Sequence, residues 1–237
     1  MKVTYYGHSC FGVEVKGKHL LFDPFISPNP LAMGIKMENI KADYILLSHA
    51  HQDHVADAHD IAKRTGAMLI SNFEICMYYA KKGINTFRPM NIGGSVSLPG
   101  FTVQSVNAIH SSSFDDGTYG GNPGGFVVCT DEGNFYYAGD TALTYDMKLI
   151  GESHKIAFAM LPIGDNFTMG TAEAIKATEF IKCRNIIAMH YDTFDLIKID
   201  KAKTAHAFEK KNKEITFMEI GETKDFFELK YDEHIMQ

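Results

Sequence analysis

The stretch DYILLSHAHQDHV, residues 43–55, decides how the rest of this sequence is interpreted. Residues 43–48 form a nearly unbroken apolar run, which predicts a strand that is covered on both faces. Three imidazoles and one carboxylate then fall within residues 49–54. Imidazole suits zinc, iron and manganese, and the run holds no cysteine, which is unlike a closed structural zinc site. We therefore predict an open metal centre. The alternative, ordinary polar residues of a surface loop, needs four ligand-type side chains to gather there by chance.

Short strands and loops surround this run, with a few helices between them. Alternating apolar and β-branched residues predict strands, and apolar spacing of three and four residues predicts helices. The expected strands are 3–6, 11–15, 19–22, 43–48, 68–71, 95–98, 102–108, 125–130, 134–138, 185–189, 215–219 and 225–229. The expected helices are 55–66 with Gly66 as C-cap, 73–82, 171–182 with Thr171 as N-cap, and 201–211.

The order of these elements predicts the domain organisation. Nothing of low complexity divides the chain, and no repeat is visible in it. We expect one domain over residues 1–237, an α/β sandwich with two sheets inside and helices outside.

Composition excludes some partners. Lysine and arginine number 23 against 29 aspartates and glutamates, which gives a net charge of -6, and the basic residues do not cluster. A nucleic-acid partner is therefore not expected. The apolar runs are far shorter than the roughly 18 residues that cross a bilayer, so no membrane span is expected either. We expect a small-molecule substrate. A homo-oligomer stays open, because the sequence does not give the oligomeric state.

The cysteines and the amino terminus predict the compartment. Cys10, Cys76, Cys129 and Cys183 lie far apart without a Cys-x-x-Cys pair, which favours free thiols in a reducing compartment. The first residues enter a strand-like alternation at once and lack the features of a signal peptide. The sequence therefore predicts a cytoplasmic protein.

The run at residues 49–54 also carries a family resemblance. His49, His51, Asp53 and His54 match in full the His-x-His-x-Asp-His signature of the metallo-beta-lactamase superfamily, which the chain resembles over nearly its whole length. This resemblance implies a four-layer αββα sandwich of two mixed sheets. A narrower likeness, to uncharacterised metal-dependent hydrolases similar to lactonases of sugar phosphates and to N-acyl phospholipid phosphodiesterases, is carried by residues 7–9, 23–25, 162–164 and 167–169.

The resemblance implies the remaining ligands. His110, Asp140 and His190 each follow an expected strand, in the order that the family requires. An isolated histidine at a strand end is more often an ordinary polar residue than a ligand, so order and context carry this assignment. The resemblance implies two divalent ions. The first would be held by His49, His51 and His110, and the second by Asp53, His54 and His190. Asp140 would bridge them. Zinc is the first candidate, and manganese, iron or nickel are alternatives.

Two divalent ions predict a hydrolytic mechanism. They lower the pKa of bound water from ~15.7 to roughly 7 and polarise the scissile oxygen. We therefore expect a metal-bridging hydroxide to cleave a small ester, lactone or amide, with Asp53 as the catalytic residue that orients the nucleophile or transfers its proton. Asp23 is a candidate for fixing a ligand histidine or the motif loop. Its alternative role is that of a plain cap at the end of a strand.

Other residues are candidates for contacts around the metals. His8 and the glycine-rich segment 111–124 flank predicted strand ends, and we expect that segment to be a mobile rim, against the alternative of a solvated loop. Asp165 and Asn166 follow another strand end, where they are candidates for contact with substrate or with a ligand.

Competing functions stay open because one fold serves many reactions. The nearest rival is a phosphodiesterase or nuclease of the same superfamily, against which the acidic net charge stands. A di-iron redox protein of this superfamily would carry glutamate where this chain has His51. A non-catalytic metal-binding protein is the third alternative, and the complete ligand set argues against it.

Overall fold

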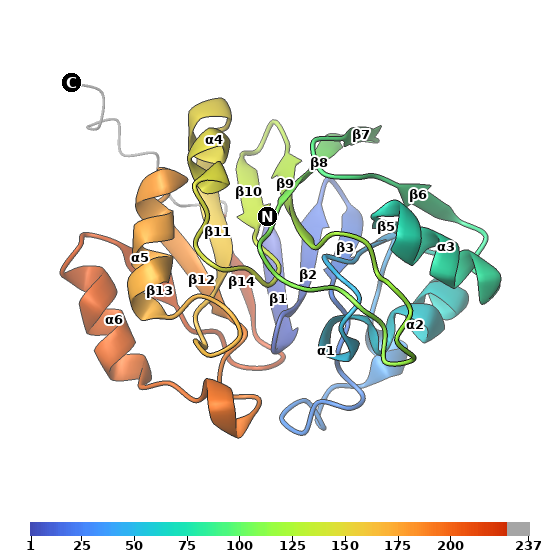
Figure 1. Ribbon diagram of the computed structural model, residues 1–237, viewed down its shortest axis with the longest axis horizontal. Helices are drawn as coiled ribbons and strands as arrows, with labels where there is room; N and C mark the ends of the chain where they lie inside the picture. The colour runs from blue at the N-terminus through green and yellow to red at the C-terminus, as the bar shows by residue number, and fades with distance from the viewer. Residues whose placement is uncertain (227–237) are drawn as a thin grey trace.

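Two seven-stranded sheets lie face to face with helices on their outer sides, in a computed structural model that describes residues 1–226 (Figure 1). The first sheet, in spatial order, contains β14 (Thr223–Asp225), β1 (Lys2–Gly7), β2 (Cys10–Val15), β3 (Lys18–Phe22), β4 (Tyr44–Leu46), β5 (Met68–Ser71) and β6 (Phe87–Pro89). The second contains β13 (Glu214–Thr216), β12 (Asn185–Met189), β11 (Ile156–Pro162), β10 (Asn134–Tyr137), β9 (Gly124–Cys129), β8 (Phe101–Asn107) and β7 (Ser95–Leu98). This layering confirms the predicted αββα sandwich.

Each sheet is antiparallel in one half and parallel in the other. In the first sheet β1, β2 and β3 form an antiparallel meander, and β3 to β6 run parallel. In the second sheet β7 to β10 are antiparallel, and β10 to β13 run parallel.

Parallel neighbours need a crossover, and helices supply most of these connections. The helices that connect strands of the first sheet are α1 (Gln52–Val55), α2 (Ala58–Thr65) and α3 (Phe73–Lys81), and those of the second are α4 (Asp146–Ser153), α5 (Thr171–Phe180) and α6 (Lys201–Glu209). Two short 3-10 helices, η1 (Met37–Asn39) and η2 (Asp195–Ile197), lie in loops. The two sets of helices therefore cover opposite outer faces (Figure 1).

Alternation along β4 explains its apolar run. Tyr44 and Leu46 belong to the larger core cluster, whereas Ile45 and Leu47 belong to a second cluster with residues of α2 and α3. The larger cluster fills the space between the sheets. There, the ring of Phe22 on β3 lies 6.2 Å from that of Phe126 on β9 and 4.8 Å from that of Tyr137 on β10. Both faces of β4 are thus covered, as predicted.

Several element boundaries differ from the predictions. The apolar pattern does not reveal α4 or β6 as elements and anticipates only the end of β11, before Asp165. The predicted helix 55–66 is divided into α1 and α2. Gly66 caps α2 with φ of 72°, as expected. Strand 215–219 is shortened to β13, and part of the predicted strand 225–229 lies outside the described residues. Among the helices of residues 1–226, none is long and apolar enough to cross a membrane.

The predicted N-cap at Thr171 is wrong. Gly170 is the N-cap of α5, without a side-chain bond, and Thr171 is the first helical residue. The Thr171 hydroxyl lies 3.0 Å from that of Thr204 on α6. A tertiary contact between the two helices thus uses the oxygen that would otherwise cap the helix.

Candidate metal centre

The predicted ligands all follow strand ends at one edge of the two sheets. The run at residues 49–54 follows β4, His110 follows β8, Asp140 follows β10 and His190 follows β12. Although β8 is antiparallel to β9, it runs parallel to β10, because β9 is antiparallel to both. Their carboxyl ends therefore lie at the same edge, which brings residues that are far apart in the sequence together.

One group of side chains consists of His49, His51 and His110. A ligand atom of each lies within 4.8 Å of the others. Nε2 of His49 is 3.0 Å from Nδ1 of His51, and the His110 ring centroid is 5.0 Å from each of the other two. Nδ1 of His49 contacts the Ser48 hydroxyl at 2.9 Å, which leaves Nε2 facing the group. Three imidazoles converging in this way offer a nitrogen-rich site for a divalent ion.

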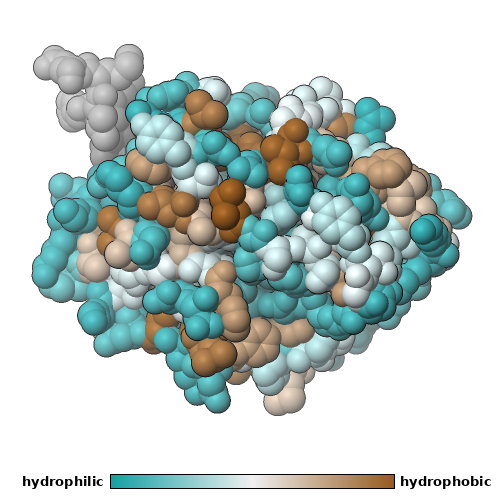
Figure 2. Space-filling view, in the orientation of Figure 1, coloured by the Kyte–Doolittle hydropathy of each residue, from teal (hydrophilic) through white to brown (hydrophobic). Residues whose placement is uncertain are grey.

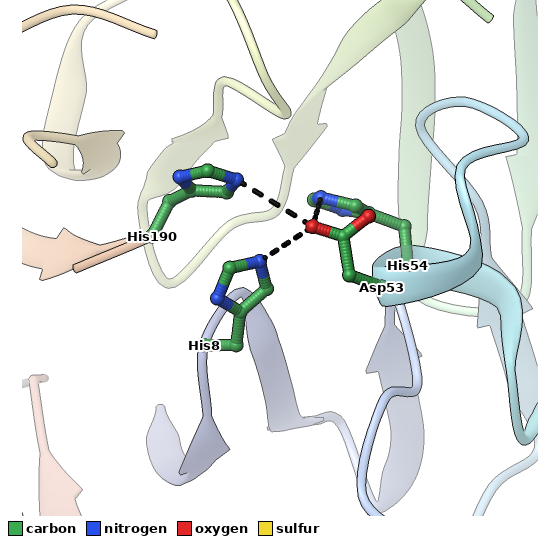
Figure 3. A group of neighbouring side chains, drawn as sticks. All are labelled: His8, Asp53, His54 and His190. Carbon is green, nitrogen blue, oxygen red and sulfur yellow. Dashed lines mark hydrogen bonds and ion pairs between the residues drawn. The ribbon is translucent and has the colours of Figure 1, made fainter. Parts of the chain in front are cut away.

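A second group, drawn in Figure 3, consists of His8, Asp53, His54 and His190. Three imidazole nitrogens converge on Oδ2 of Asp53 (Figure 3): Nε2 of His8 at 3.0 Å and Nε2 of both His54 and His190 at 3.8 Å. The ligands of a tetrahedral zinc ion are about 3.3 Å apart, given bonds of about 2.0 Å. The spacing of Asp53, His54 and His190 is therefore compatible with a shared ion.

Asp140 lies between the two groups. Its Oδ2 is 2.9 Å from Nε2 of His190 and 3.2 Å from that of His54 in the second group. The same oxygen is 3.6 Å from Nε2 of His110 and 4.0 Å from that of His49 in the first. One carboxylate oxygen thus faces imidazoles of both groups.

Burial and charged neighbours make some of the imidazoles neutral and others protonated. Burial lowers the pKa of His8 to about 4 and, together with His54, holds the pKa of His49 well below its ordinary value. Burial also lowers the pKa of His190, but Asp140 outweighs it and raises that pKa to about 9. Burial raises the pKa of Asp140, but His190 and His54 outweigh it and hold that pKa well below its usual range. In the metal-free protein, imidazolium protons therefore neutralise the carboxylate.

A further observation indicates that the candidate ligands suit metal ions. Within residues 1–226, the fully buried Nε2 of His54 makes no well-aligned hydrogen bond, although Oδ2 of Asp140 lies 3.2 Å away, and Oδ1 of Asp140 has no hydrogen-bond partner. A buried polar atom without a partner costs free energy of about 1–3 kcal/mol. Coordination of a cation by the imidazole nitrogen would satisfy it.

Asp23, which directly follows β3, anchors the motif loop, residues 49–54. Its Oδ2 is 2.8 Å from Nδ1 of His54 and accepts from the Tyr137 hydroxyl at 2.7 Å and the Ser48 hydroxyl at 2.5 Å. Its Oδ1 accepts from the Ser48 backbone nitrogen at 2.7 Å. The carboxylate therefore contacts a ligand histidine and the start of the motif loop at once, which are the two contacts that the sequence suggests for it.

Three residues of the site have left-handed backbones. His8, Asp23 and His190 have φ of 56°, 41° and 55°. Non-glycine residues seldom adopt this conformation, and such strain gathers at functional sites. Each of these residues directly follows a strand, where the reversed turn directs its side chain into the site.

The segment 111–124 lies beside the first group but is firmly fastened. The Ser111 hydroxyl is 3.3 Å from Nε2 of His51, and the Ser112 hydroxyl accepts from the Ala50 backbone. The Asn72 amide donates to the carbonyls of residues 120 and 122, and the Phe114 ring stacks on Tyr78 at 3.5 Å. The mobility of the segment stays a prediction.

Asp165 and Asn166 do not join the ligands. Oδ1 of Asp165 accepts from the backbone of Asn166, and within residues 1–226 neither side chain bonds to a candidate ligand. Both line a cavity of about 760 Å³ beside the amino-terminal ends of α5 and α6. Their contact with substrate stays a prediction.

Comparison with known proteins identifies the family of the chain. Residues 2–190 match the beta-lactamase superfamily domain. A UPF0173 metal-dependent hydrolase of Flavobacterium johnsoniae is 54% identical over 94% of this chain and 99% of its own length. The chain belongs to the beta-lactamase superfamily. It is a metal-dependent hydrolase of that superfamily.

Solved structures share the fold of this hydrolase. Igni18, a metallo hydrolase from Ignicoccus hospitalis, superposes with a TM-score of 0.85 and 37% identity, over 94% of this chain and 97% of Igni18. An isothiocyanate hydrolase from Delia radicum gut bacteria shares the fold, with a TM-score of 0.78 and 19% identity over 95% of this chain and 99% of its own.

Some residues around the metal centre of this hydrolase escape sequence reasoning. Ser48, Tyr137 and Thr193 each bond to a site residue, to His49, Asp23 and His8 respectively. Serine, tyrosine and threonine are common in loops and strands, so type and spacing do not single them out. For Ser48 a signal exists, because it directly precedes the motif, whereas Tyr137 and Thr193 carry none.

Proposed function

We propose that this hydrolase cleaves a small ester, lactone or amide at a binuclear metal centre, with zinc as the first candidate ion. The position of Asp140 Oδ2, within 4.0 Å of imidazole nitrogens from both ligand groups, carries the binuclear proposal. Two sets of donors on either side of one carboxylate are what a pair of ions bridged by that carboxylate requires.

The residues take separate roles in this proposal. The first ion would be held by His49, His51 and His110, the second by Asp53, His54 and His190, and both by Asp140. When bound, such ions lower the pKa of water to roughly 7 and polarise the oxygen of the scissile carbonyl. No serine or cysteine nucleophile is then needed.

Asp53 is proposed as the catalytic residue. Its side chain is 27% exposed, more than the 13% of His110 and the 2% of Asp140, so it can reach both the ligands and a substrate. Burial raises its pKa, but His54 and the hydrogen bonds of His190 and His8 outweigh this and hold the pKa well below its ordinary value. Asp53 is thus ionised at neutral pH and able to orient the attacking water or to carry its proton to the leaving group.

Apolar side chains beside the ligands favour a substrate with an apolar part. Phe194 is 38% exposed with its ring 5.4 Å from that of His8, and Ile109, which precedes His110 in the chain, is 51% exposed. The face seen in Figure 2 is mostly hydrophilic with separate apolar patches. Small apolar surfaces of this kind suit a small molecule, which we propose as the partner.

The test combines metal analysis with a substrate panel. Protein prepared with zinc should contain two ions per chain, and His51→Gln and His190→Gln should each reduce this to one. The zinc-loaded protein is then assayed on esters, lactones, amides and phosphodiesters. Hydrolysis in the first three classes supports the proposal, preferential cleavage of phosphodiesters favours the rival reading, and no turnover of any class by the fully loaded protein contradicts it.

A further inference from the structure

His8 is a fully buried imidazole on the turn between β1 and β2. Its φ of 56° places it in the left-handed region, and none of its surface is exposed. A buried polar ring on a strained turn costs free energy twice, once for the conformation and once for desolvation. Contacts that the ring makes on both nitrogens compensate for this.

The hydrogen bonds of the ring fix which nitrogen carries the proton. Nε2 of His8 lies 3.0 Å from Oδ2 of Asp53, as Figure 3 shows. An ionised carboxylate only accepts hydrogen bonds, so Nε2 must be the donor. Among the contacts of residues 1–226, Nε2 of His8 faces the Asp53 carboxylate alone. The Nε2 atoms of His54 and His190 lie 3.8 Å from the same oxygen and also 3.2 Å and 2.9 Å from Oδ2 of Asp140, the oxygen between the two groups.

Thr193 holds the other nitrogen. Its hydroxyl is 2.9 Å from Nδ1 of His8 and a longer 3.4 Å from the carbonyl oxygen of Tyr191. In a neutral imidazole with a protonated Nε2, Nδ1 is the acceptor, so the hydroxyl donates to His8 in the shorter contact. Thr193 is itself buried, with 7% of its surface exposed. The order of donation is then Thr193 to His8 and His8 to Asp53, which fixes both the tautomer and the direction of the ring.

Aromatic rings and the backbone seat the imidazole further. Phe25 and Phe194 meet the His8 ring edge-on at centroid distances of 5.6 Å and 5.4 Å. The carbonyl oxygen of His8 accepts from the backbone nitrogen of His190 at 2.9 Å. One residue thus contacts the side chain of Asp53 and the backbone of His190, both in the second ligand group.

We propose that His8 is a positioning residue: held by Thr193, it fixes the Asp53 carboxylate through Nε2 and thereby sets the affinity of Asp53, His54 and His190 for a divalent ion. The inference rests on the proposed binuclear function, which it deepens. It assigns His8 neither to the ion nor to the substrate.

Zinc titration of the metal-free, full-length protein against a competing chelator tests this, with zinc alone as the probe. His8→Asn suits the left-handed backbone but is too short to reach Asp53, whereas His8→Gln places an amide N–H near the position of Nε2. Thr193→Val removes the hydroxyl that holds Nδ1, and Thr193→Ser keeps it. We expect His8→Asn and Thr193→Val to weaken one of the two zinc sites by about 10- to 100-fold, and His8→Gln and Thr193→Ser to stay near the wild-type affinity.

The other zinc site is the internal control. A general loss of structure would weaken both sites, whereas loss of positioning weakens only one. Wild-type affinity at both sites in His8→Asn and Thr193→Val overturns the proposal. So does loss of one zinc in His8→Gln with none in Thr193→Val, because that result indicates a direct ligand. If His8→Asn does not fold, Thr193→Val decides, since it leaves the strained turn unchanged.

The readout also separates this inference from the proposed function. It uses the metal alone and needs no substrate. A wild-type protein that binds two zinc ions but hydrolyses no panel compound would contradict the function and leave the role of His8 to be decided by the titration.

Discussion

Oδ2 of Asp23 lies 2.8 Å from Nδ1 of His54, and neither side chain is exposed to solvent. Asp23 follows β3 and His54 belongs to α1, so this contact joins two segments of the chain behind the metal centre. Because Nδ1 of His54 is engaged, its Nε2 is left to face Asp140 at 3.2 Å. The contact therefore sets which nitrogen of a ligand histidine is available.

Asp23→Asn should weaken metal binding and the fold together. The amide N–H₂ cannot accept from the Ser48 and Tyr137 groups that surround the carboxylate, so buried donors lose their partner. We expect zinc affinity to fall by about 10- to 100-fold and the free energy of unfolding to fall by about 1–3 kcal/mol. Zinc titration and urea unfolding measure the two effects. Tyr137→Phe, which removes one hydroxyl, is the milder control, and an unchanged zinc affinity in Asp23→Asn would contradict the role given to Asp23.

Asp53→Ala should abolish turnover and leave the fold intact. The partly exposed carboxylate is removed without opening a large cavity, so the far-ultraviolet circular dichroism should match that of the wild type. We expect kcat/KM to fall by at least about 10²- to 10⁴-fold on the best substrate of the panel. Full activity in this variant would show that another group orients the nucleophile.

Zinc binding at pH 7 should release protons. The pKa of His190 is raised to about 9 by Asp140, so its imidazole is protonated at pH 7 and must lose that proton to become a ligand. Calorimetric titration in buffers of different ionisation enthalpy measures the number released. We expect at least one proton at pH 7 and fewer as the pH passes 9. A heat of binding that is the same in all buffers at pH 7 would show that no proton is released and would contradict a protonated His190.

The stability of the metal-free protein should decline as pH rises through the same range. His190 titrates at 6.5 when unfolded and at about 9 when folded, so its contribution is fully present below pH 6.5 and is lost between pH 6.5 and about 9. Urea unfolding across this range, with chelator present, checks the slope. His190→Gln is the control, and its profile should be flatter than that of the wild type. Equal slopes would mean that His190 does not carry the proton.

Gly164→Ala should displace His190 through the backbone. A Cβ at this position would lie 2.1 Å from the carbonyl oxygen of His190 and 3.0 Å from Cβ of Ile197. Since backbone must move to accept it, we expect a loss of about 1–3 kcal/mol in the free energy of unfolding, with weaker zinc binding. Gly34→Ala is the matched control, because nothing lies within 4 Å of the Cβ there. Equal midpoints of thermal unfolding in Gly164→Ala and Gly34→Ala would contradict the close approach of Gly164 to the His190 backbone.

The sequence by itself determined the layered fold and the first four candidate ligands. Residues 43–55 place a strand with two buried faces directly before contiguous ligands, and both signals are local: side-chain alternation and spacing within a few residues. His110, Asp140 and His190 needed the family resemblance, since each is a single residue at a strand end. The error at Thr171 arose where a tertiary contact replaced a local hydrogen bond.

Only the tertiary structure decided how these residues face one another. Thr193 and His8 are 185 positions apart, and Tyr137 and Asp23 are 114 apart, yet each pair shares a hydrogen bond. Such pairs form because the strand ends of two stacked sheets meet at one edge, a relation between distant segments that no local pattern encodes. The same packing buries His8 and gives it one donor and one acceptor partner. The sequence thus specifies which residue types can act as ligands, whereas the fold determines the orientation and the charge of their side chains.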